Sequence, residues 1–177
     1  MERRLQPALL SVDFSPRKSL HPKLFVYTIN LMKTVQAICD VIASQCIASR
    51  VRFLNRVITA IYDEALRPLD LTLNQLNTLV VLVKMKCCNA KKVGEFLQMD
   101  PSTVSRNLER MKQAGWIRFD PGEDARSFQL SVTKKGEKML VKALPAWRKA
   151  QKEASAVLKE EGAAAVSRAA LNLQARF

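Results

Sequence analysis

The chain has 177 residues, enough for one domain or two small interlocked ones, and carries 29 lysines and arginines against 16 acidic residues, a net charge of +13. Basic residues spread along a chain indicate a polyanionic partner, nucleic acid first and an anionic membrane second, rather than a merely soluble basic protein. No apolar run approaches the roughly 18 residues of a transmembrane helix. Pro7 and Asp13 interrupt any signal-peptide core. We therefore expect a cytoplasmic protein without a membrane partner.

The cysteine and histidine pattern argues against a metal site and against an enzyme. The four cysteines, Cys39, Cys46, Cys87 and Cys88, lack the spacing of zinc ligands, and His21 is the single histidine. The glycines are scattered singly, so there is no phosphate-binding loop. We expect no catalytic residues, no metal and no cofactor, with the cysteines reduced.

The N-terminal part divides into two regions. Residues 1–31 contain three prolines and no sustained period, which predicts a poorly ordered extension. From about Thr34 to Leu66 the chain lacks glycine and proline and repeats apolar residues at helical spacing, which predicts one long helix. So little chain surrounds this helix that one copy cannot bury it, which indicates a partner helix.

Two short helices follow and predict a helix-turn-helix. Thr72 and Gln75 have the spacing of a capping box, which opens a helix from Leu73 to about Met85. A short helix over Ala90–Leu97 precedes the stretch "MDPSTVSRNLERMKQAGW". Gly94 suits the position where two helices cross closely. A tight turn between these short helices is typical of DNA-binding proteins.

The helix within that stretch has clear ends and two different faces. Asp100 suits the N-cap, Pro101 the first helical position and Gly115 the left-handed residue past the end. Val104, Leu108 and Met111 form one narrow apolar stripe. The other side carries hydroxyl and guanidinium groups: Ser102 and Arg106 point away from the stripe, with Thr103, Ser105 and Arg110 on the flanks.

The rest of the chain predicts a hairpin and a long helix. Trp116–Phe119 and Phe128–Val132 read as strands around a Pro-Gly loop, and a helix-turn-helix followed by a hairpin is a winged helix. Thr133 then caps a helix from about Lys134, which Pro145 should kink and Gly162 should end, before a last helix over Ala163–Leu173. The predicted fold class is mainly α with a small β-hairpin wing. A winged helix-turn-helix domain over 72–133 joins a helical dimerisation region over 32–71 and 134–177.

Several ordered motifs in this chain resemble the MarR family of winged-helix transcription regulators. They are "LTLNQ", "STVSR", "GWI", "DAR" and "TKKG", within a match over roughly residues 48–152. The resemblance implies a two-fold homodimer that binds a pseudo-palindromic DNA operator, with half-sites roughly 10 bp apart. It also implies a repressor, released by a small ligand or by thiol oxidation.

The resemblance assigns roles to individual residues. Ser102, Thr103, Ser105, Arg106 and Asn107 match the part of the recognition helix that contacts DNA, and we add Arg110 from its place on the same helix. Asp124 and Arg126 match the wing motif, in which the arginine reaches the minor groove and the aspartate orients it. Two positions depart from the family pattern: Gln98 replaces the usual turn glycine, and Phe119 stands where a basic residue is common.

The input signal stays open between alternatives. Family effectors are often small aromatic or phenolic compounds, bound between the dimerisation region and the winged helix. Cys39 and Cys46, seven residues apart, share a helix face and could sense oxidants, although small buried hydrophobic side chains are the simpler interpretation. A winged-helix adaptor that binds proteins is a further alternative, and it would lack a steep salt dependence with duplex DNA.

Overall fold

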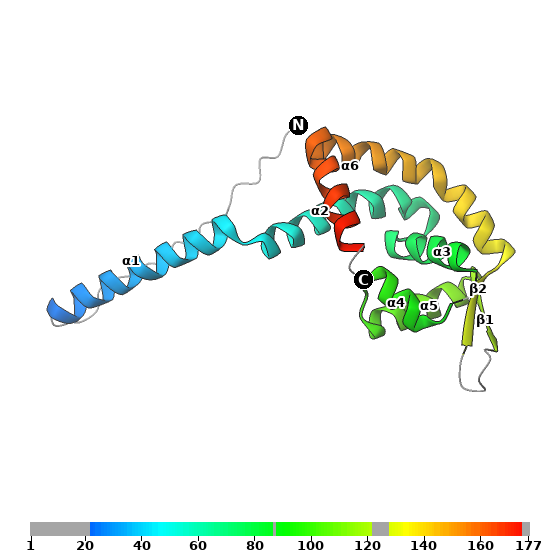
Figure 1. The fold of residues 1–177 in the computed structure, drawn as a ribbon, viewed down its shortest axis with the longest axis horizontal. Coiled ribbons are helices and arrows are strands. Elements are labelled where there is room, and N and C mark those ends of the chain that lie inside the picture. Colours follow the sequence, from blue (N-terminus) through cyan, green and yellow to red (C-terminus); the bar gives the residue numbers. More distant parts are fainter. Residues whose placement is uncertain (1–21, 87, 122–127, 175–177) are drawn as a thin grey trace. The chain divides into compact units, whose positions relative to one another are not determined.

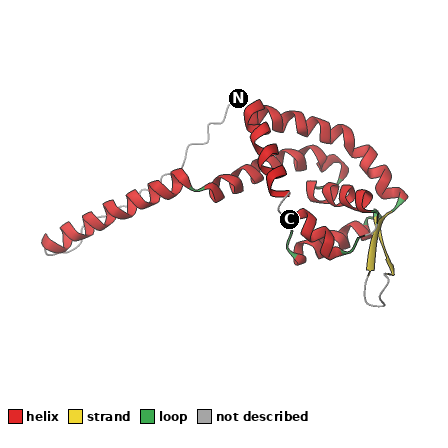
Figure 2. Ribbon diagram, in the orientation of Figure 1, coloured by secondary structure: helices red, strands yellow, loops and turns green. Residues whose placement is uncertain are grey.

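A computed structural model describes residues 22–86, 88–121 and 128–174. By backbone contacts the chain forms two compact units, residues 1–50 and 51–177. The elements are helices, apart from one hairpin (Figures 1 and 2). In chain order they are α1 (Pro22–Gln45), α2 (Ile47–Leu66), a 3₁₀ turn (Arg67–Leu69), α3 (Leu73–Met85), α4 (Ala90–Leu97), α5 (Pro101–Gln113), β1 (Ile117–Pro121), β2 (Phe128–Val132) and α6 (Lys134–Gln174).

Helix α1 corrects the predicted start of the first helix. It begins at Pro22, not near Thr34, so residues 22–31 belong to it, while residues 1–21 lie outside the described part. A proline is tolerated in the first turn because its missing N–H has no helical partner there. Since residues 23–31 contain no further proline and no glycine, nothing stops the helix until much later.

The predicted single helix over 34–66 is also interrupted, at Cys46 between α1 and α2. The amide of Cys46 donates to Ile42 O at 2.9 Å and its carbonyl accepts from Arg50 N at 3.3 Å, so helical hydrogen bonds reach the break from both sides. The guanidinium of Arg50 donates to the carbonyl of Ser44 next to the break. Because neither glycine nor proline marks this position, the sequence pattern did not reveal it.

The core of the second unit is built around α3, which contacts α4, α5, β2 and α6. Figure 1 shows α3 between α6 on one side and the α4–α5 pair on the other. Fully buried side chains come from each of these layers and form one cluster, with Leu66, Leu79, Leu82, Val93, Met111 and Leu130 among its largest members. The predicted winged helix is therefore present: two helices, a turn, a recognition helix and a hairpin on a shared core.

The hairpin follows the prediction, with β2 as expected and β1 starting one residue and ending two residues later than predicted. β1 and β2 pair antiparallel, from Ile117 opposite Val132 to Pro121 opposite Phe128. Ile117 and Leu130 face the core, whereas Phe128 is exposed. An additional bridge joins Leu130 to Cys88, whose carbonyl accepts from Leu130 N at 2.8 Å.

Helix α6 differs from the prediction at its break. Its dihedral angles stay helical through Pro145, which lies exposed, and the non-helical residue is Lys159 (φ 57°, ψ 168°), three residues before the predicted stop at Gly162. The part of α6 that follows its contact with the main core packs on the C-terminal part of α2. There Tyr62 contacts Ala150 and Ala154, and burial raises the pKa of its phenol.

Candidate nucleic-acid interface

The N-terminus of α5 is capped as its sequence predicts. The Asp100 carboxylate accepts Thr103 N–H at 2.9 Å, the Ser102 hydroxyl at 2.6 Å and the Thr103 hydroxyl as well. These hydrogen bonds, the one from Ser102 first, hold the pKa of Asp100 far below its usual range. The first turn of α5 is thus fixed before any ligand binds. The hydroxyls of Ser102 and Thr103 already donate within the protein, so their remaining capacity is to accept.

The C-terminus of α5 ends in a Schellman motif at Gly115, which has the predicted left-handed conformation (φ 72°). Trp116 N donates to Met111 O at 3.0 Å, and Gly115 N donates to Lys112 O at 2.8 Å. Both ends of the recognition helix are therefore closed by local hydrogen bonds, and its length is set by the sequence.

The turn between α4 and α5 accommodates the missing glycine. Gln98 takes the left-handed conformation (φ 51°, ψ 45°), and its side-chain amide donates to Glu95 O at 2.7 Å. Gly94 fits the predicted crossing, because a Cβ there would lie 3.3 Å from both Met99 O and a Val104 methyl. The departure at Gln98 thus leaves the turn of the motif intact.

One face of α5 anchors it to the core. Val104, Leu108 and Met111 are at most 3% exposed, which confirms the predicted stripe. Asn107 was expected among the DNA contacts, but it is half-buried and its amide donates to the hydroxyl of Thr78 on α3 at 3.0 Å. Thr78 itself is fully buried. The structure places Asn107 at the seam between α3 and α5, where it orients the recognition helix.

The opposite face of α5 is open. Ser102, Ser105, Arg106 and Arg110 are exposed and Thr103 is half-buried. Within the described residues, neither arginine is paired with a carboxylate. Five of the six residues predicted on α5 therefore lie on its solvent-facing side. Two of them, Arg106 and Arg110, carry guanidinium groups without an acidic partner among the described residues.

The predicted wing residues Asp124 and Arg126 lie outside the described residues, between the paired strand ends Pro121 and Phe128. The strands contain an ion pair that the sequence reasoning missed. Arg118 donates to both oxygens of Asp120 at 3.0 Å, and the Ser131 hydroxyl donates to Asp120 at 2.6 Å. These hydrogen bonds, the one from Ser131 first, lower the pKa of Asp120. Opposite charges two residues apart on one strand face were the available signal.

Phe119 occupies the position where the family commonly has a basic residue. The ammonium of Lys112, from the last turn of α5, lies 4.8 Å from the centre of the Phe119 ring. Phe128 contacts the same ring with a centroid distance of 6.4 Å. A positive charge is therefore present beside this position, supplied by the recognition helix instead of by the strand.

The motif "TKKG" has a structural explanation at the junction of α5, β1 and α6. Thr133 caps α6: its hydroxyl accepts Gly136 N–H at 3.1 Å and donates to Gly115 O at 2.7 Å. Its amide donates to Trp116 O at 2.9 Å. Gly136 is required because a Cβ there would lie 2.2 Å from that same Trp116 oxygen. This junction, called the Thr133 junction below, fastens the end of the recognition helix to the start of α6.

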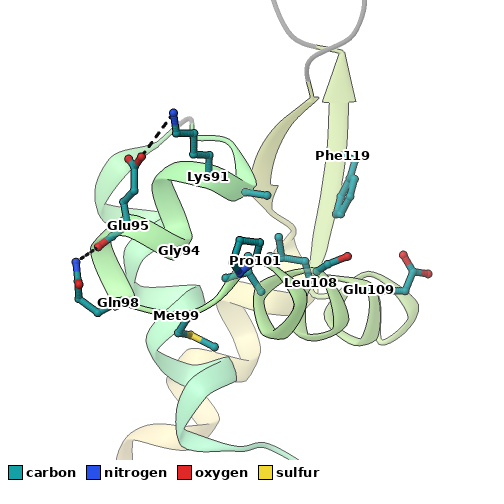
Figure 3. A pocket seen from close by; sticks show the side chains of 12 residues that line it. Lys91, Gly94, Glu95, Gln98, Met99, Pro101, Leu108, Glu109 and Phe119 are labelled. Atoms are coloured by element: carbon teal, nitrogen blue, oxygen red, sulfur yellow. Dashed lines mark hydrogen bonds and ion pairs between the residues drawn. The ribbon is translucent and has the colours of Figure 1, made fainter.

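A pocket of about 810 Å³ adjoins the recognition helix. Figure 3 shows Phe119 of β1 facing α4 across it, with Pro101 and Leu108 of α5 between them. Met99 adds to the apolar lining, and Ser105, one of the predicted DNA contacts, lines the same pocket. The ion pair of Lys91 and Glu95 (3.8 Å) lies on α4 at its edge. The pocket is thus open, largely apolar and shared with the exposed face of α5.

The two cysteines singled out in the sequence lie in the first unit. Cys39 is exposed and Cys46, at the break between α1 and α2, is half-buried, and neither is in a disulfide. Hydrogen bonds from the side chain and backbone of Ser49 lower the pKa of the Cys46 thiol. The prediction that both are buried hydrophobic side chains is therefore wrong for Cys39 in the single chain.

The capped recognition helix, its turn and the hairpin define a winged-helix protein, and comparison with known proteins places it in a family. The sequence model of the MarR family matches residues 69–127. The DNA-bound transcriptional regulator MosR of M. tuberculosis is 32% identical with a TM-score of 0.63, over 75% of this chain and 97% of MosR. The chain belongs to the MarR family of transcription regulators.

Two further relatives agree with this assignment. The organic hydroperoxide resistance transcriptional regulator of Bacillus subtilis is 35% identical over 91 residues, which are 51% of this chain and 62% of that protein. A MarR variant from E. coli, solved with operator DNA, has the same fold with a TM-score of 0.66 at 18% identity, over 75% of this chain and 96% of its own. The chain matches 53% to 62% of the length of three curated relatives. Among the described residues, no helix has the length and apolar character needed to cross a membrane.

Proposed function

We propose that this protein is a sequence-specific DNA-binding transcription regulator, acting as a homodimeric repressor. The observation that carries the proposal is the exposed face of α5, where Ser102, Ser105, Arg106 and Arg110 stand on a helix fixed at both ends and by its buried stripe. Such a helix can enter the major groove without reorganising, because its backbone is already held. The net charge of +13 supports a polyanionic partner.

The test is binding of the full chain to the DNA upstream of its own gene, followed by fluorescence anisotropy at several salt concentrations. Arg106→Ala should weaken binding to that DNA by about 1–3 kcal/mol if the arginine reads a base edge, with a smaller effect on unrelated DNA. Arg168→Ala, which removes an exposed cation near the end of α6, is the matched control. Equal affinities of wild type and Arg106→Ala would refute the assigned role, and a flat salt dependence would favour the protein adaptor.

The dimer is proposed from the apolar residues that the single chain leaves exposed. Val35, Ile38 and Ile42 on α1, Val51 and Phe53 on α2, and Val166 and Leu171 near the end of α6 are each 47% exposed or more. Apolar residues at such density on helices are typical of a subunit interface. We expect light scattering at micromolar concentration to give twice the chain mass, and two half-sites about one DNA turn apart.

The pocket beside α5 is the proposed site for a small aromatic or phenolic effector, and it lies within the winged helix instead of between it and the dimerisation region, where the resemblance puts such ligands. Phe119, Met99 and Leu108 offer apolar and aromatic contacts, and Ser105 offers a hydroxyl. Because Ser105 also belongs to the exposed face of α5, an occupied pocket would compete with DNA. A phenolic library should contain compounds that raise the dissociation constant for DNA in wild type and not in a Phe119→Ala variant that retains its fold.

A thiol-based input is the second candidate, favoured by the lowered pKa of Cys46 and by the exposure of Cys39, seven residues earlier in the chain. The thiolate would attack a hydroperoxide and break its O–O bond, giving a sulfenate, which then takes up a proton to become the sulfenic acid, and an alcohol. Under this alternative, cumene hydroperoxide should release wild type from DNA and leave Cys46→Ser bound. Release of both proteins, or of neither, would eliminate Cys46 as the sensor.

A further inference from the structure

One face of α6 carries a row of lysines that the proposed function does not use. The members, called the lysine stripe below, are Lys135, Lys138, Lys142, Lys149 and Lys152, and all are exposed. At 100° per residue they fall within an arc of about 100° around the helix. Ala143, Ala150 and Ala154, which are at most 4% exposed, lie on a different face and fix the stripe toward solvent.

The stripe is almost free of neutralising charge. No member forms an ion pair with another described residue, whereas the neighbouring Lys134 is paired with Glu137 at 3.1 Å. Glu137, the one acidic residue of the 134–152 segment, lies outside the arc, and Glu153, directly after the segment, lies at its edge. Lysines three or four positions apart on a helix repel one another, so this arrangement costs stability that a polyanion would restore.

The stripe is long and starts near the recognition helix. From Lys135 to Lys152 it extends about 26 Å at 1.5 Å per residue. The side chain of Lys135 lies over Gly115, since a Cβ on that glycine would be 3.6 Å from the Lys135 Cδ. From there α6 continues on the side of α3 away from α4 and α5 (Figure 1). The stripe is therefore a surface distinct from the part of α5 that exposes Ser102, Ser105 and Arg106.

We propose that the lysine stripe binds the phosphate backbone of a second segment of duplex DNA, separate from the segment held by α5. Lysines act as point charges, and the nearby Arg148 and Trp147 point about 40° and 120° outside the arc, so the stripe itself holds no guanidinium to read a base and no ring to anchor an apolar peptide. Duplex DNA presents one negative charge about every 1.7 Å along its axis, so about 15 phosphates lie along the length of the stripe and each of its five lysines can reach one. DNA bound at α5 would also raise the local concentration of DNA near the stripe. Because this step requires α5 to bind DNA, the inference rests on the proposed function.

The test is a two-duplex capture assay with the full chain. A biotinylated duplex carrying the upstream DNA is immobilised and saturated with protein, and a fluorescent duplex of unrelated sequence is then added. Wild type should retain the second duplex. The variant Lys138→Gln/Lys142→Gln/Lys149→Gln should retain at least about tenfold less, with a salt slope shallower by about 2.7, while its affinity for the first duplex stays within about twofold.

Two further variants separate the alternatives. The matched control, Lys33→Gln/Lys159→Gln/Arg168→Gln, removes the same charge from exposed positions elsewhere and should still capture the second duplex. Arg106→Ala should weaken binding of the first duplex and spare the salt-dependent binding of unrelated DNA. Full capture by the stripe variant, or equal loss in the control, would overturn the proposal. If Arg106→Ala instead binds the first duplex as tightly as wild type, the assignment of α5 as the recognition helix fails. The proposal for the lysine stripe then depends on whether the triple lysine variant has the shallower salt slope.

Discussion

Gly136→Ala tests the Thr133 junction with the smallest possible change, one methyl group. The added Cβ would lie 2.2 Å from Trp116 O and 2.7 Å from a Val132 methyl, and Cβ contacts under 3.0 Å essentially do not occur. The first turn of α6 would have to move away from Trp116. The same oxygen accepts Thr133 N–H at 2.9 Å, so this movement would also weaken the cap.

The expected cost follows from these contacts. Overpacking against backbone costs about 1–3 kcal/mol. Weakening the two hydrogen bonds of the cap, from Thr133 N–H to Trp116 O and from Gly136 N–H to the Thr133 hydroxyl, costs about 1 kcal/mol each. Alanine recovers about 1 kcal/mol of helix propensity. We therefore expect a net loss of about 2–4 kcal/mol, which for a chain of this size lowers the melting temperature by roughly 5–15 °C. Far-UV circular dichroism against temperature, repeated in urea, measures both quantities.

Gly162→Ala is the matched control, because its Cβ would make an ordinary contact of 3.6 Å with Leu158. It should melt at or slightly above the wild-type temperature, since only the propensity gain remains. The reasoning would be refuted if Gly136→Ala were as stable as Gly162→Ala. Agreement between the two would mean that α6 shifts at no cost and that the glycine of this motif has no packing role.

Three other predictions address the core, the wing and the cap. Leu108→Ala should lower the free energy of unfolding by about 2–5 kcal/mol in urea titrations, because its side chain is 2% exposed; a smaller loss would mean that the stripe does not anchor α5. Arg126→Ala should weaken DNA binding about tenfold without changing the melting temperature. Asp124→Ala should also weaken DNA binding, although it removes a negative charge. Tighter binding by Asp124→Ala would show that the aspartate only repels DNA. Because the pKa of Asp100 is lowered in the folded state, its carboxylate stabilises the protein at pH values above the unfolded-state pKa of about 4. This contribution is lost as the pH falls below that value. The melting temperature of wild type should therefore fall more steeply below pH 4 than that of Asp100→Asn.

The parts of the fold that the sequence predicted well are those closed by local hydrogen bonds. Asp100 at the start of α5 and the pair Thr72 and Gln75 at the start of α3 are side chains that satisfy backbone groups within three residues. Such contacts depend on the neighbouring sequence alone. The hairpin was equally accessible, because Ile117 and Leu130 are buried in one core while the residues beside them on each strand are half-buried or exposed.

The parts that the sequence did not reveal depend on groups distant along the chain or on backbone geometry without a residue signature. Asn107 looks like any polar residue of a recognition helix until Thr78, 29 positions earlier, is placed beside it. Lys159 has a left-handed φ of 57°, and Cys46 interrupts a helix, although neither residue type predicts such a break. The motif around Thr133 and Gly136 was visible, yet its explanation required the position of Trp116.

The division of α5 into an anchoring face and an exposed face has an evolutionary consequence. The residues that hold the helix, Val104, Leu108 and Asn107 among them, are not the ones that solvent reaches, Ser105 and Arg106. Substitutions at exposed positions usually change stability by less than about 0.5 kcal/mol. Under the proposed function, a new operator preference can therefore arise at the exposed positions one mutation at a time, without passing through a poorly folded intermediate, so descendants of one gene can diverge to control different promoters.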